Sequence, residues 1–295
     1  MTKKVVISKL PKTGLGNKLF SWASGVVFAR VNKREHIVTG LTRIHPMTFF
    51  RNDKSKRFYF GYFENEATFY LKRLKKPVYL KQEDSNARVD WENPAIFNEV
   101  PSWSDMFVVL KDYRSLIVNK FWTTLTEKIK SRIEQREFPE CSIHIRMGDF
   151  RQLSEGENFA EVGGVRTPIE YFISVVNRIR EEVGETLPFT IFSDGNDEQL
   201  ETILSLPNVK RAEDDLDIVH LGLMSKSKLI VMSAGSTFSY WSGFLSTAIL
   251  IKHYQHVHAD IRDEDLNSNI FEGEIHPGKA MSPLLIKNLQ EVFHK

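Results

Sequence analysis

The sequence has one cysteine, almost no net charge and no long apolar run, and each absence excludes a class of protein. Cys141 alone cannot form an internal disulfide, which suits a reducing compartment, and we expect it in a buried strand. Nowhere do about 18 apolar residues follow one another, and the N-terminal "MTKKVVISKLPKTG" lacks an apolar signal region. We therefore expect a cytoplasmic protein without signal peptide or membrane span.

The formal net charge of +2 is too small to indicate nucleic-acid binding by itself. Two basic clusters, 54–57 and 72–76, are either solvated faces or contacts with an anionic substrate or a membrane surface that carries it. With 295 residues, 41% of them hydrophobic, the chain can form one large domain or two halves with real cores.

A strand, a glycine turn and a helix are expected at the N-terminus. The elements expected in the first half are a strand at 4–10, the turn at 14–16, a helix at 17–31, an irregular aromatic-rich stretch at 41–104, a strand at 106–110 and a helix at 113–133.

After Glu140, short apolar strands alternate regularly with helices. The strands expected are 141–146, 189–193, 208–211, 228–232 and 248–252, and the helices are 168–182, 196–205, 215–226, 236–246 and one that begins at Ser282-Pro283. This alternation predicts an α/β fold with a parallel sheet covered on both faces. Ligands of such sheets bind at the carboxyl ends of the strands.

The stretch "IHIRMGD" places charged groups at such a strand end. The two-residue period puts His144 and Arg146 on one face and Met147 on the other, and Gly148 permits a turn that carries Asp149 out of the sheet. The planar guanidinium of an arginine suits phosphate oxygens. The alternative is a structural Arg146–Asp149 ion pair that only closes the strand end.

Two further strands end in polar residues before a helix. "TIFSDGNDEQL" ends in Ser193-Asp194, and "LIVMSAGSTFSYWSGFL" leads into a helix that Ser236 or Thr237 would cap. Helix N-termini carry partial positive charge and free N–H groups, so several of them at one edge predict an anion site. The alternative is that these hydroxyls merely begin helices.

The first half offers "GLGN", Gly14 to Asn17, in a strand-to-helix turn. It lacks the third glycine of the dinucleotide fingerprint and the lysine of a P-loop. Its backbone amides could approach a pyrophosphate closely, and Asn17 could donate to it.

Taken together, five stretches in order over about residues 5–245 resemble the alpha-1,2-fucosyltransferases, glycosyltransferase family 11, of bacterial type. They are "GLGNKLFSWA", "FGYFENEATF", "SIHIRMGDF", "FTIFSDGNDE" and "DLDIVHLGLMSKSKLIVMSAGSTFSYWSGFL". Three positions depart from the family pattern: the second arginine of its H-x-R-R-x-D motif is Met147, its LM-S-C cysteine is Lys226, and its Asn-Ser-Ser triplet is 234–236.

The resemblance implies two Rossmann-like domains whose parallel sheets face a cleft, the GT-B arrangement. The domains would be an acceptor-side α/β domain at 1–138, a nucleotide-sugar-binding domain at 139–280, and a C-terminal helix at 281–295 that packs back on the first half. The implied reaction is inverting transfer of L-fucose from GDP-fucose, without metal or other cofactor, to O2 of a terminal galactose. The implied partners are GDP-fucose and a galactose-terminated oligosaccharide or lipid-linked glycan, with peripheral membrane association.

The resemblance also assigns site residues. Arg146 would hold the donor diphosphate, with His144 and Asp149 around it. The chemistry of the transfer also calls for a carboxylate or histidine as the catalytic base, for which Asp149 is the first candidate and His144 the second. The donor-binding residues would be Gly14, Gly16, Asn17, Arg146, Ser193, Asp194, Ser236, Thr237, Phe238 and Ser239.

Several other patterns favour structural interpretations. The Asp-x-Asp strings at 215–217 and 263–265 suit a helix start and a charged stretch better than a metal site, and "HYQHVH" at 253–258 suits a strand or loop. Trp241 and Phe238 suit a core, whereas the aromatic residues Phe58, Tyr59, Tyr62 and Phe63 could be core or could line an acceptor cleft. Two other functions stay open: a non-catalytic module that binds a nucleotide sugar or glycan, and a glycosyltransferase with another donor.

Overall fold

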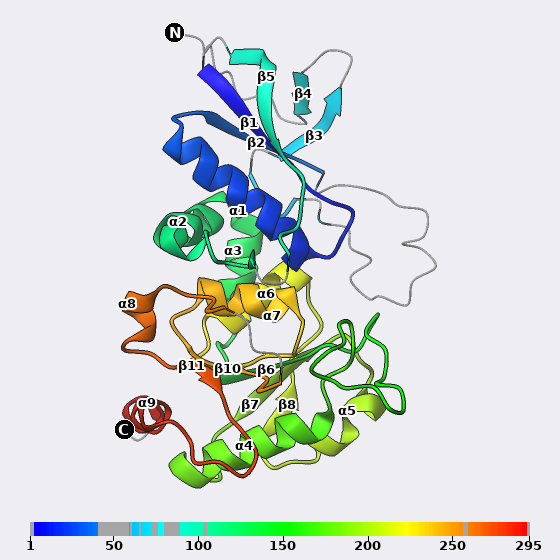
Figure 1. The fold of residues 1–295 in the computed structure, drawn as a ribbon, viewed down its shortest axis with the longest axis vertical. Coiled ribbons are helices and arrows are strands. Elements are labelled where there is room, and N and C mark those ends of the chain that lie inside the picture. The colour runs from blue at the N-terminus through cyan, green and yellow to red at the C-terminus, as the bar shows by residue number, and fades with distance from the viewer. Residues whose placement is uncertain are drawn as a thin grey trace. The chain divides into compact units, whose positions relative to one another are not determined.

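The structure is a computed structural model that separates the chain into two compact units, Met1–Glu134 and Gln135–Lys295, each with its own sheet (Figure 1). The residues that it describes are 3–40, 59, 61–64, 66–71, 76–79, 89–102, 105–255 and 259–293. The basic clusters at 54–57 and 72–75 lie outside these residues, as do Phe58 and residues 256–258.

The sheet of the first unit has the strand order β4-β3-β2-β1-β5. Its strands are β1 (Lys3–Lys9), β2 (Glu35–Thr39), β3 (Glu66–Leu71), β4 (Lys76–Tyr79) and β5 (Val89–Phe97). β1 pairs in parallel with β2 and β5, and β3 with β4 is antiparallel. Only β1 was expected from the sequence. Acidic residues and Pro94 obscure the strand pattern in β5, and an edge strand tolerates such a proline.

Helix α1 (Leu15–Val31) packs on β1 through a largely apolar face. It approaches the sheet closely at Gly25, where a Cβ would overlap Ser8 Oγ and lie 2.6 Å from His36 Nε2. The Ser8 hydroxyl donates to the Ser21 carbonyl at 2.8 Å and lies 2.9 Å from the ring nitrogen of His36. Glycine at position 25 therefore makes room for a buried polar contact between helix and sheet.

Two expectations for the end of this unit are wrong. Residues 106–110 form turns before a short 3-10 helix, η3 (Lys111–Tyr113), and Phe107 has a φ of +63°, which a strand does not permit. The single helix expected at 113–133 is two helices, α2 (Arg114–Thr124) and α3 (Glu127–Glu134). They separate because Leu125 is extended and forms a bridge with Phe63.

The sheet of the second unit is entirely parallel, with the order β11-β10-β9-β6-β7-β8. Its strands are β6 (Cys141–Ile145), β7 (Phe189–Ser193), β8 (Val209–Arg211), β9 (Leu229–Val231), β10 (Ile249–Lys252) and β11 (Glu272–Glu274). Its helices are α4 (Ile169–Val183), α5 (Asp197–Leu204), α6 (Asp217–Ser225), α7 (Thr237–Leu245), α8 (Glu264–Asn267) and α9 (Pro283–Phe293). The predicted alternation is confirmed, and α8 and β11 are additions to it.

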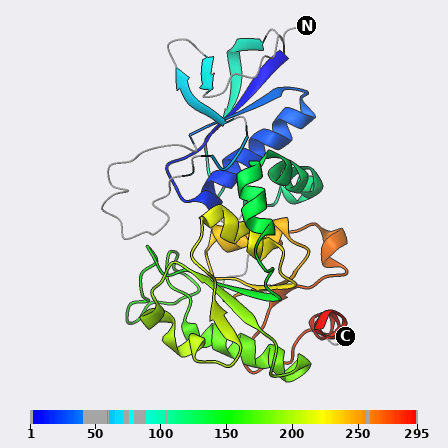
Figure 2. The ribbon, with the colours of Figure 1, turned by 180° about the vertical axis from the view of Figure 1, so that it is seen from behind.

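Helices cover both faces of this sheet, as the alternation predicted: α6 and α7 lie on one face, and α4 and α5 on the other (Figures 1 and 2). In β6 the side chains of Cys141, Ile143 and Ile145 join the apolar core that includes α4, α5 and α9. Burial raises the pKa of the Cys141 thiol, as suits a core residue. Ser142 and His144 point to the opposite face, where Ser142 Oγ lies 2.6 Å from Ser227 Oγ and His144 contacts Phe238.

Helix α9 buries Leu285 and Leu289 in this same core and contacts α4 and β10. Asn288 of α9 accepts a hydrogen bond from the Phe271 N–H at 2.7 Å. The apolar face of α9, which was expected to pack back on the first half, thus has its contacts within the second unit. Among the residues that the structure describes, no helix has both the length and the apolar character needed to cross a bilayer.

Candidate functional site

The candidate site lies where three neighbouring strands of the second unit end. β9, β6 and β7 are adjacent and parallel, so their carboxyl ends meet at one edge of the sheet. Arg146 follows β6, Asp194 follows β7 and Ser233 lies just after β9. The sheet therefore brings together three stretches that the sequence singled out separately.

The guanidinium of Arg146 pairs with two carboxylates at this edge. One terminal nitrogen donates to Asp194 and the other to Asp149, and the guanidinium carbon lies 5.7 Å from the centre of the Phe150 ring. The Arg146 side chain is 23% exposed, Asp194 24% and Asp149 53%. The Arg146–Asp149 ion pair considered as an alternative is thus present, but a second carboxylate also fixes the arginine, which stays accessible.

Asp194 is held from two directions. Its Oδ1 accepts the backbone N–H of Met147 at 2.8 Å while Oδ2 accepts from Arg146. A Cβ at position 148 would overlap this carboxylate, which explains why a glycine follows Met147. The "RMGD" turn and the "SDG" turn therefore form one interlocked unit.

Ser233 connects the ends of β6 and β9. Its hydroxyl accepts the backbone N–H of Arg146 and donates to the carbonyl of His144, both at 2.8 Å. One serine thus satisfies two backbone groups where the strand pairing stops and fixes the backbone that carries Arg146.

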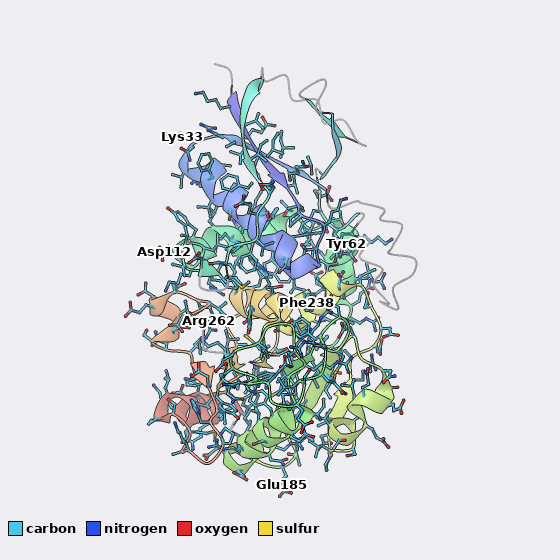
Figure 3. All side chains as sticks on the ribbon, turned by 45° about the vertical axis from the view of Figure 1, so that its right-hand side comes forward. Lys33, Tyr62, Asp112, Glu185, Phe238 and Arg262 are labelled. Atoms are coloured by element: carbon cyan, nitrogen blue, oxygen red, sulfur yellow. The ribbon has the colours of Figure 1, made fainter. Side chains whose placement is uncertain are left out.

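His144 lies beneath the site and is 5% exposed. Its ring lies 5.3 Å from that of Phe238, which Figure 3 labels, and its buried Nδ1 has no hydrogen-bond partner among the described residues. Burial lowers the pKa of His144 to about 3, and the charges of Arg146 and His220 lower it further in the same direction. His144 is therefore neutral at physiological pH.

Helix α7 begins at this edge, and its N-cap residue does not cap it through its side chain. Ser236 is the N-cap residue, with an extended backbone, but its hydroxyl makes no capping hydrogen bond. Helix α5 differs: Asn196 accepts from the Gln199 N–H at 2.9 Å, and Gln199 accepts from the Asn196 N–H at 3.0 Å. In α5 the capping box thus occupies N–H groups of the first turn, whereas the N-cap hydroxyl of α7 occupies none, so the anion site expected at these helix starts stays a prediction with α7 as its more open member.

The remaining predicted donor residues of the second unit differ in accessibility. Ser193 accepts the Gly195 N–H at 3.0 Å, so its hydroxyl shapes the turn. Ser239 is fully buried and donates to the Ser236 carbonyl at 3.0 Å within α7. Thr237 and Phe238 are half-buried and are therefore the more accessible of the predicted α7 residues. A role of Ser239 in donor binding stays a prediction with less support.

Two arginines that the sequence did not single out hold the site turns in place. Arg166 Nε donates to the carbonyls of Phe150 at 2.8 Å and Met147 at 3.2 Å. Arg211 donates to the carbonyls of Gly195 at 2.6 Å and Ser193 at 3.3 Å and also pairs with Asp197. No local pattern identifies such backbone-directed arginines, because their partners lie 15 or more residues away.

In the first unit, the "GLGN" turn leads directly into α1, whose N-cap is Gly14. Gly14 has an ordinary φ of −63°, and a Cβ there would meet nothing within 4 Å, so neither backbone conformation nor packing requires a glycine. Gly16 is buried, and Asn17 is half-buried in the first turn. Lys18, which no sequence pattern singles out, lies among the buried residues of α1. Its ammonium donates to the Pro11 carbonyl at 2.7 Å and the Gly40 carbonyl at 3.0 Å, which fixes this turn.

The Asp-x-Asp strings begin helices. Asp217 opens α6, Asp215 pairs with Arg136 at 3.1 Å, and Asp263 caps α8 by accepting the Leu266 N–H at 2.9 Å. Within the described ranges, no group of three or more His, Cys, Asp or Glu residues is arranged to hold a metal ion.

The aromatic residues mostly belong to cores. Trp241 is fully buried, and Tyr59, Tyr62 and Phe63 are also buried, which favours core packing over an acceptor surface at these positions. His253 is buried too, with its ring 4.3 Å from that of Tyr171.

Met147 is predicted to be a packing residue that arginine cannot replace. It is 5% exposed in the core, and a Cβ at Gly195 would lie 2.8 Å from its Cγ. We expect Met147→Arg to destabilise the fold by about 3 kcal/mol or more because it buries a charge, and Met147→Leu by less than about 1.5 kcal/mol. Chemical denaturation measures both. An arginine variant that keeps its stability and binds GDP much more tightly would contradict this account.

The buried His144 is predicted to make stability depend on pH. Its pKa is about 3 in the folded chain, against an ordinary value of about 6.5, so only the unfolded state gains a proton as the pH falls through this window. The unfolding free energy should therefore fall by about 2 kcal/mol between pH 7 and pH 5 through this residue. His144→Phe keeps a ring against Phe238 but cannot titrate. In this variant the fall of the unfolding free energy between pH 7 and pH 5 should be smaller by about 2 kcal/mol. His36, whose pKa burial also lowers to about 3, contributes equally in both proteins. An unchanged pH dependence in the variant would contradict the assignment.

Comparison with known proteins identifies the family. The family model described as glycosyl transferase family 11 matches residues 11–266. Among solved structures, the chain is similar to NodZ alpha-1,6-fucosyltransferase co-crystallized with GDP, with 13% identity, a TM-score of 0.50, and coverage of 84% of this chain and 94% of that one. It is also similar to POFUT1 in complex with GDP, with 11% identity, a TM-score of 0.52, and coverage of 84% and 95%.

No match was found among curated proteins. At identities this low the likeness to the solved structures concerns the fold, an α/β fold with parallel sheets. The family match extends over most of the sequence, from the turn before α1 to α8. The chain therefore belongs to glycosyl transferase family 11 and is a glycosyltransferase.

Proposed function

We propose that this protein transfers L-fucose from GDP-fucose, with inversion, to an acceptor hydroxyl, and that the second unit holds the donor at the ends of β6, β7 and β9. The observation that carries the proposal is the guanidinium of Arg146, which is fixed by Asp194 yet accessible at the same sheet edge as the start of α7, whose N-cap hydroxyl makes no capping hydrogen bond. Family membership and the GDP named for two structures of similar fold support the choice of donor.

The chemistry requires positive charge at this edge. Breaking the sugar–phosphate bond leaves growing negative charge on GDP, and catalysis consists in stabilising that charge more in the transition state than in the ground state. A guanidinium whose position is already set by Asp194 and by the Ser233-bound backbone needs no reorganisation to do this. The N–H groups of α7 add a second set of donors. The proposed transfer uses no metal ion.

Two carboxylates, Asp149 and Asp194, already pair with the Arg146 guanidinium to which the donor diphosphate would bind. Asp194 is bound to both Arg146 and the Met147 N–H, whereas Asp149 is twice as exposed. We therefore assign Asp149 as the group that the diphosphate replaces on Arg146. Donor binding would then release a carboxylate beside the reacting sugar, and a free carboxylate is a better proton acceptor than one paired with a guanidinium.

This exchange favours Asp149 over His144 as the catalytic base. A catalytic base must come within hydrogen-bond reach of the acceptor hydroxyl; His144 is only 5% exposed, whereas the Asp149 side chain is 53% exposed. His144 instead supports the site from below through its contact with Phe238. Gly14, Gly16 and Asn17 complete the proposal as donor contacts from the first unit, in a GT-B arrangement with residues 1–138 on the acceptor side.

For the acceptor we propose O2 of a terminal galactose in an oligosaccharide, carried on a lipid at the cytoplasmic face of a membrane. The family resemblance motivates this choice of sugar. Two alternatives remain distinguishable by experiment: a module that binds a nucleotide sugar or glycan without turnover, and a transferase with another nucleotide sugar.

The donor is tested by nucleotide binding. GDP should raise the melting temperature of the native chain, since a ligand at 100 times its Kd stabilises the fold by about 2.7 kcal/mol, while UDP and CMP should not. Arg146→Ala should weaken GDP binding about ten-fold or more, because it removes charge-assisted hydrogen bonds. Arg151→Ala is the matched control, as Arg151 is an exposed arginine of the following loop that pairs with Glu157. A melting temperature raised by UDP but not by GDP would contradict the assignment of GDP as the donor nucleotide.

Turnover is tested by GDP release from GDP-fucose over a panel of acceptor sugars, with galactose-terminated ones expected to react. Asp149→Asn should bind GDP more tightly than the native chain, because the competing carboxylate is neutral, yet transfer fucose about 100-fold or more slowly, because the base is lost. Arg146→Ala should lose transfer at least as strongly. GDP binding without release for any acceptor would favour the binding module, and weaker GDP binding by Asp149→Asn would contradict the exchange.

A further inference from the structure

The nearly neutral chain is built from two strongly and oppositely charged units. Residues 1–134 contain 25 lysines and arginines against 13 acidic residues, a formal charge of +12. Residues 135–295 contain 15 against 25, a formal charge of −10, which together give the +2 of the chain. A separation of this size between two parts of one chain points to a polyanionic partner for the basic part.

Part of this basic charge lies on the surface at the C-terminal end of α1. Arg30 and Lys33 are exposed, and Arg34 lies over the Phe28 ring at 5.3 Å. Between Arg30 and Lys33, Val31 is 57% exposed. Within the described part of the first unit, none of the three cations pairs with a carboxylate. We call these four residues, Arg30, Val31, Lys33 and Arg34, the α1-end basic patch; Figure 3 labels Lys33 at the outer edge of the unit.

The backbone conformation of Lys33 is one that glycine adopts at lower free-energy cost than lysine. The helix ends in a Schellman motif: the Lys33 N–H donates to the Arg30 carbonyl at 3.4 Å and the Arg34 N–H to the Ala29 carbonyl at 2.8 Å. The residue after the C-cap in this motif is usually glycine because it must adopt a positive φ, and Lys33 has a φ of +51°. The helix dipole favours nearby cations, but it does not require one at the glycine position. Such strain is typical of positions that serve function.

We propose that the first unit docks on an anionic lipid bilayer through the α1-end basic patch, with Val31 entering the interfacial layer. Apolar exposure favours a bilayer over a nucleic acid as the polyanion. Of the seven large hydrophobic side chains exposed among the described residues, five belong to the first unit: Val31, Ile96, Val108, Val109 and Tyr113. A cation beside an exposed apolar side chain suits headgroups above acyl chains. The second unit, with its charge of −10, is repelled by the same surface.

This inference rests on the proposed function in one respect: the bilayer would carry the lipid-linked acceptor. The donor would then be bound by one unit while the other keeps the protein at the surface where acceptors are concentrated. Docking itself needs no transfer reaction, so it can be measured independently of the catalytic proposal.

The test is co-sedimentation of the full chain with phosphatidylcholine vesicles that contain about 30% phosphatidylglycerol, an anionic surface that attracts lysine and arginine. Binding should be strong at low salt, weaken as the ionic strength rises, and be absent with pure phosphatidylcholine. Each cation near such a surface contributes about five-fold in affinity, so Arg30→Glu with Lys33→Glu should weaken binding about 25-fold or more. Lys279→Glu, the same change at an exposed lysine of the second unit, should leave binding unchanged.

Lys33→Gly separates binding from folding. Glycine relieves the positive φ, so the melting temperature should rise, while vesicle binding should fall about five-fold. A purely structural role of Lys33 would not change these two quantities in opposite directions. Fucose transfer to a soluble acceptor should be the same in all four proteins. Vesicle binding without any transfer would contradict the proposed function and leave this inference standing.

Three results would overturn the inference. They are equal binding to pure phosphatidylcholine, unchanged vesicle binding by the Arg30→Glu, Lys33→Glu protein, and binding of a DNA duplex through these residues without binding of vesicles.

Discussion

The interaction on which the site depends is the contact of Asp194 with both the guanidinium and the turn that carries it. One carboxylate oxygen accepts from Arg146, the other accepts the Met147 N–H at 2.8 Å, and Gly148 provides the space. Ser233 fixes the same backbone from the β9 side, and Arg166 and Arg211 hold the two turns by their carbonyls. An arginine held in this way is already in position before an anion binds, as the proposed electrostatic catalysis requires.

The sequence predicted the second unit much better than the first. Strands such as Leu229–Val231 are apolar on both faces and are followed by a serine and glycine turn, so composition alone identifies them. In the first unit, β5 contains acidic residues and a proline, and the helix break at Leu125 follows from a bridge to Phe63 rather than from a proline or glycine. Tertiary contacts decide such elements, and these contacts leave no trace in a short stretch of sequence.

The same difference applies to the site. Alternation placed His144 and Arg146 on one face and Met147 in the core, and parallel strand order brought Asp194 and Ser233 to the same edge. The sequence does not show which hydroxyls and helix N-termini remain available to bind a ligand. Ser193 forms a turn, Ser239 is buried in α7, and α5 caps itself through Asn196. These outcomes depend on hydrogen-bond partners, which residue type alone does not reveal.

Met147 and Gly195 lie so close together that neither position accepts a bulkier side chain alone. The methionine side chain fills the space that a side chain at 195 would need, and its other neighbours are core residues around β6 and α4. A chain with arginine at 147 would have to open this part of the core and rebuild the turn that presents Asp194. The second arginine of the family motif and the residue after the "SD" pair should therefore vary together among relatives, as one inherited unit.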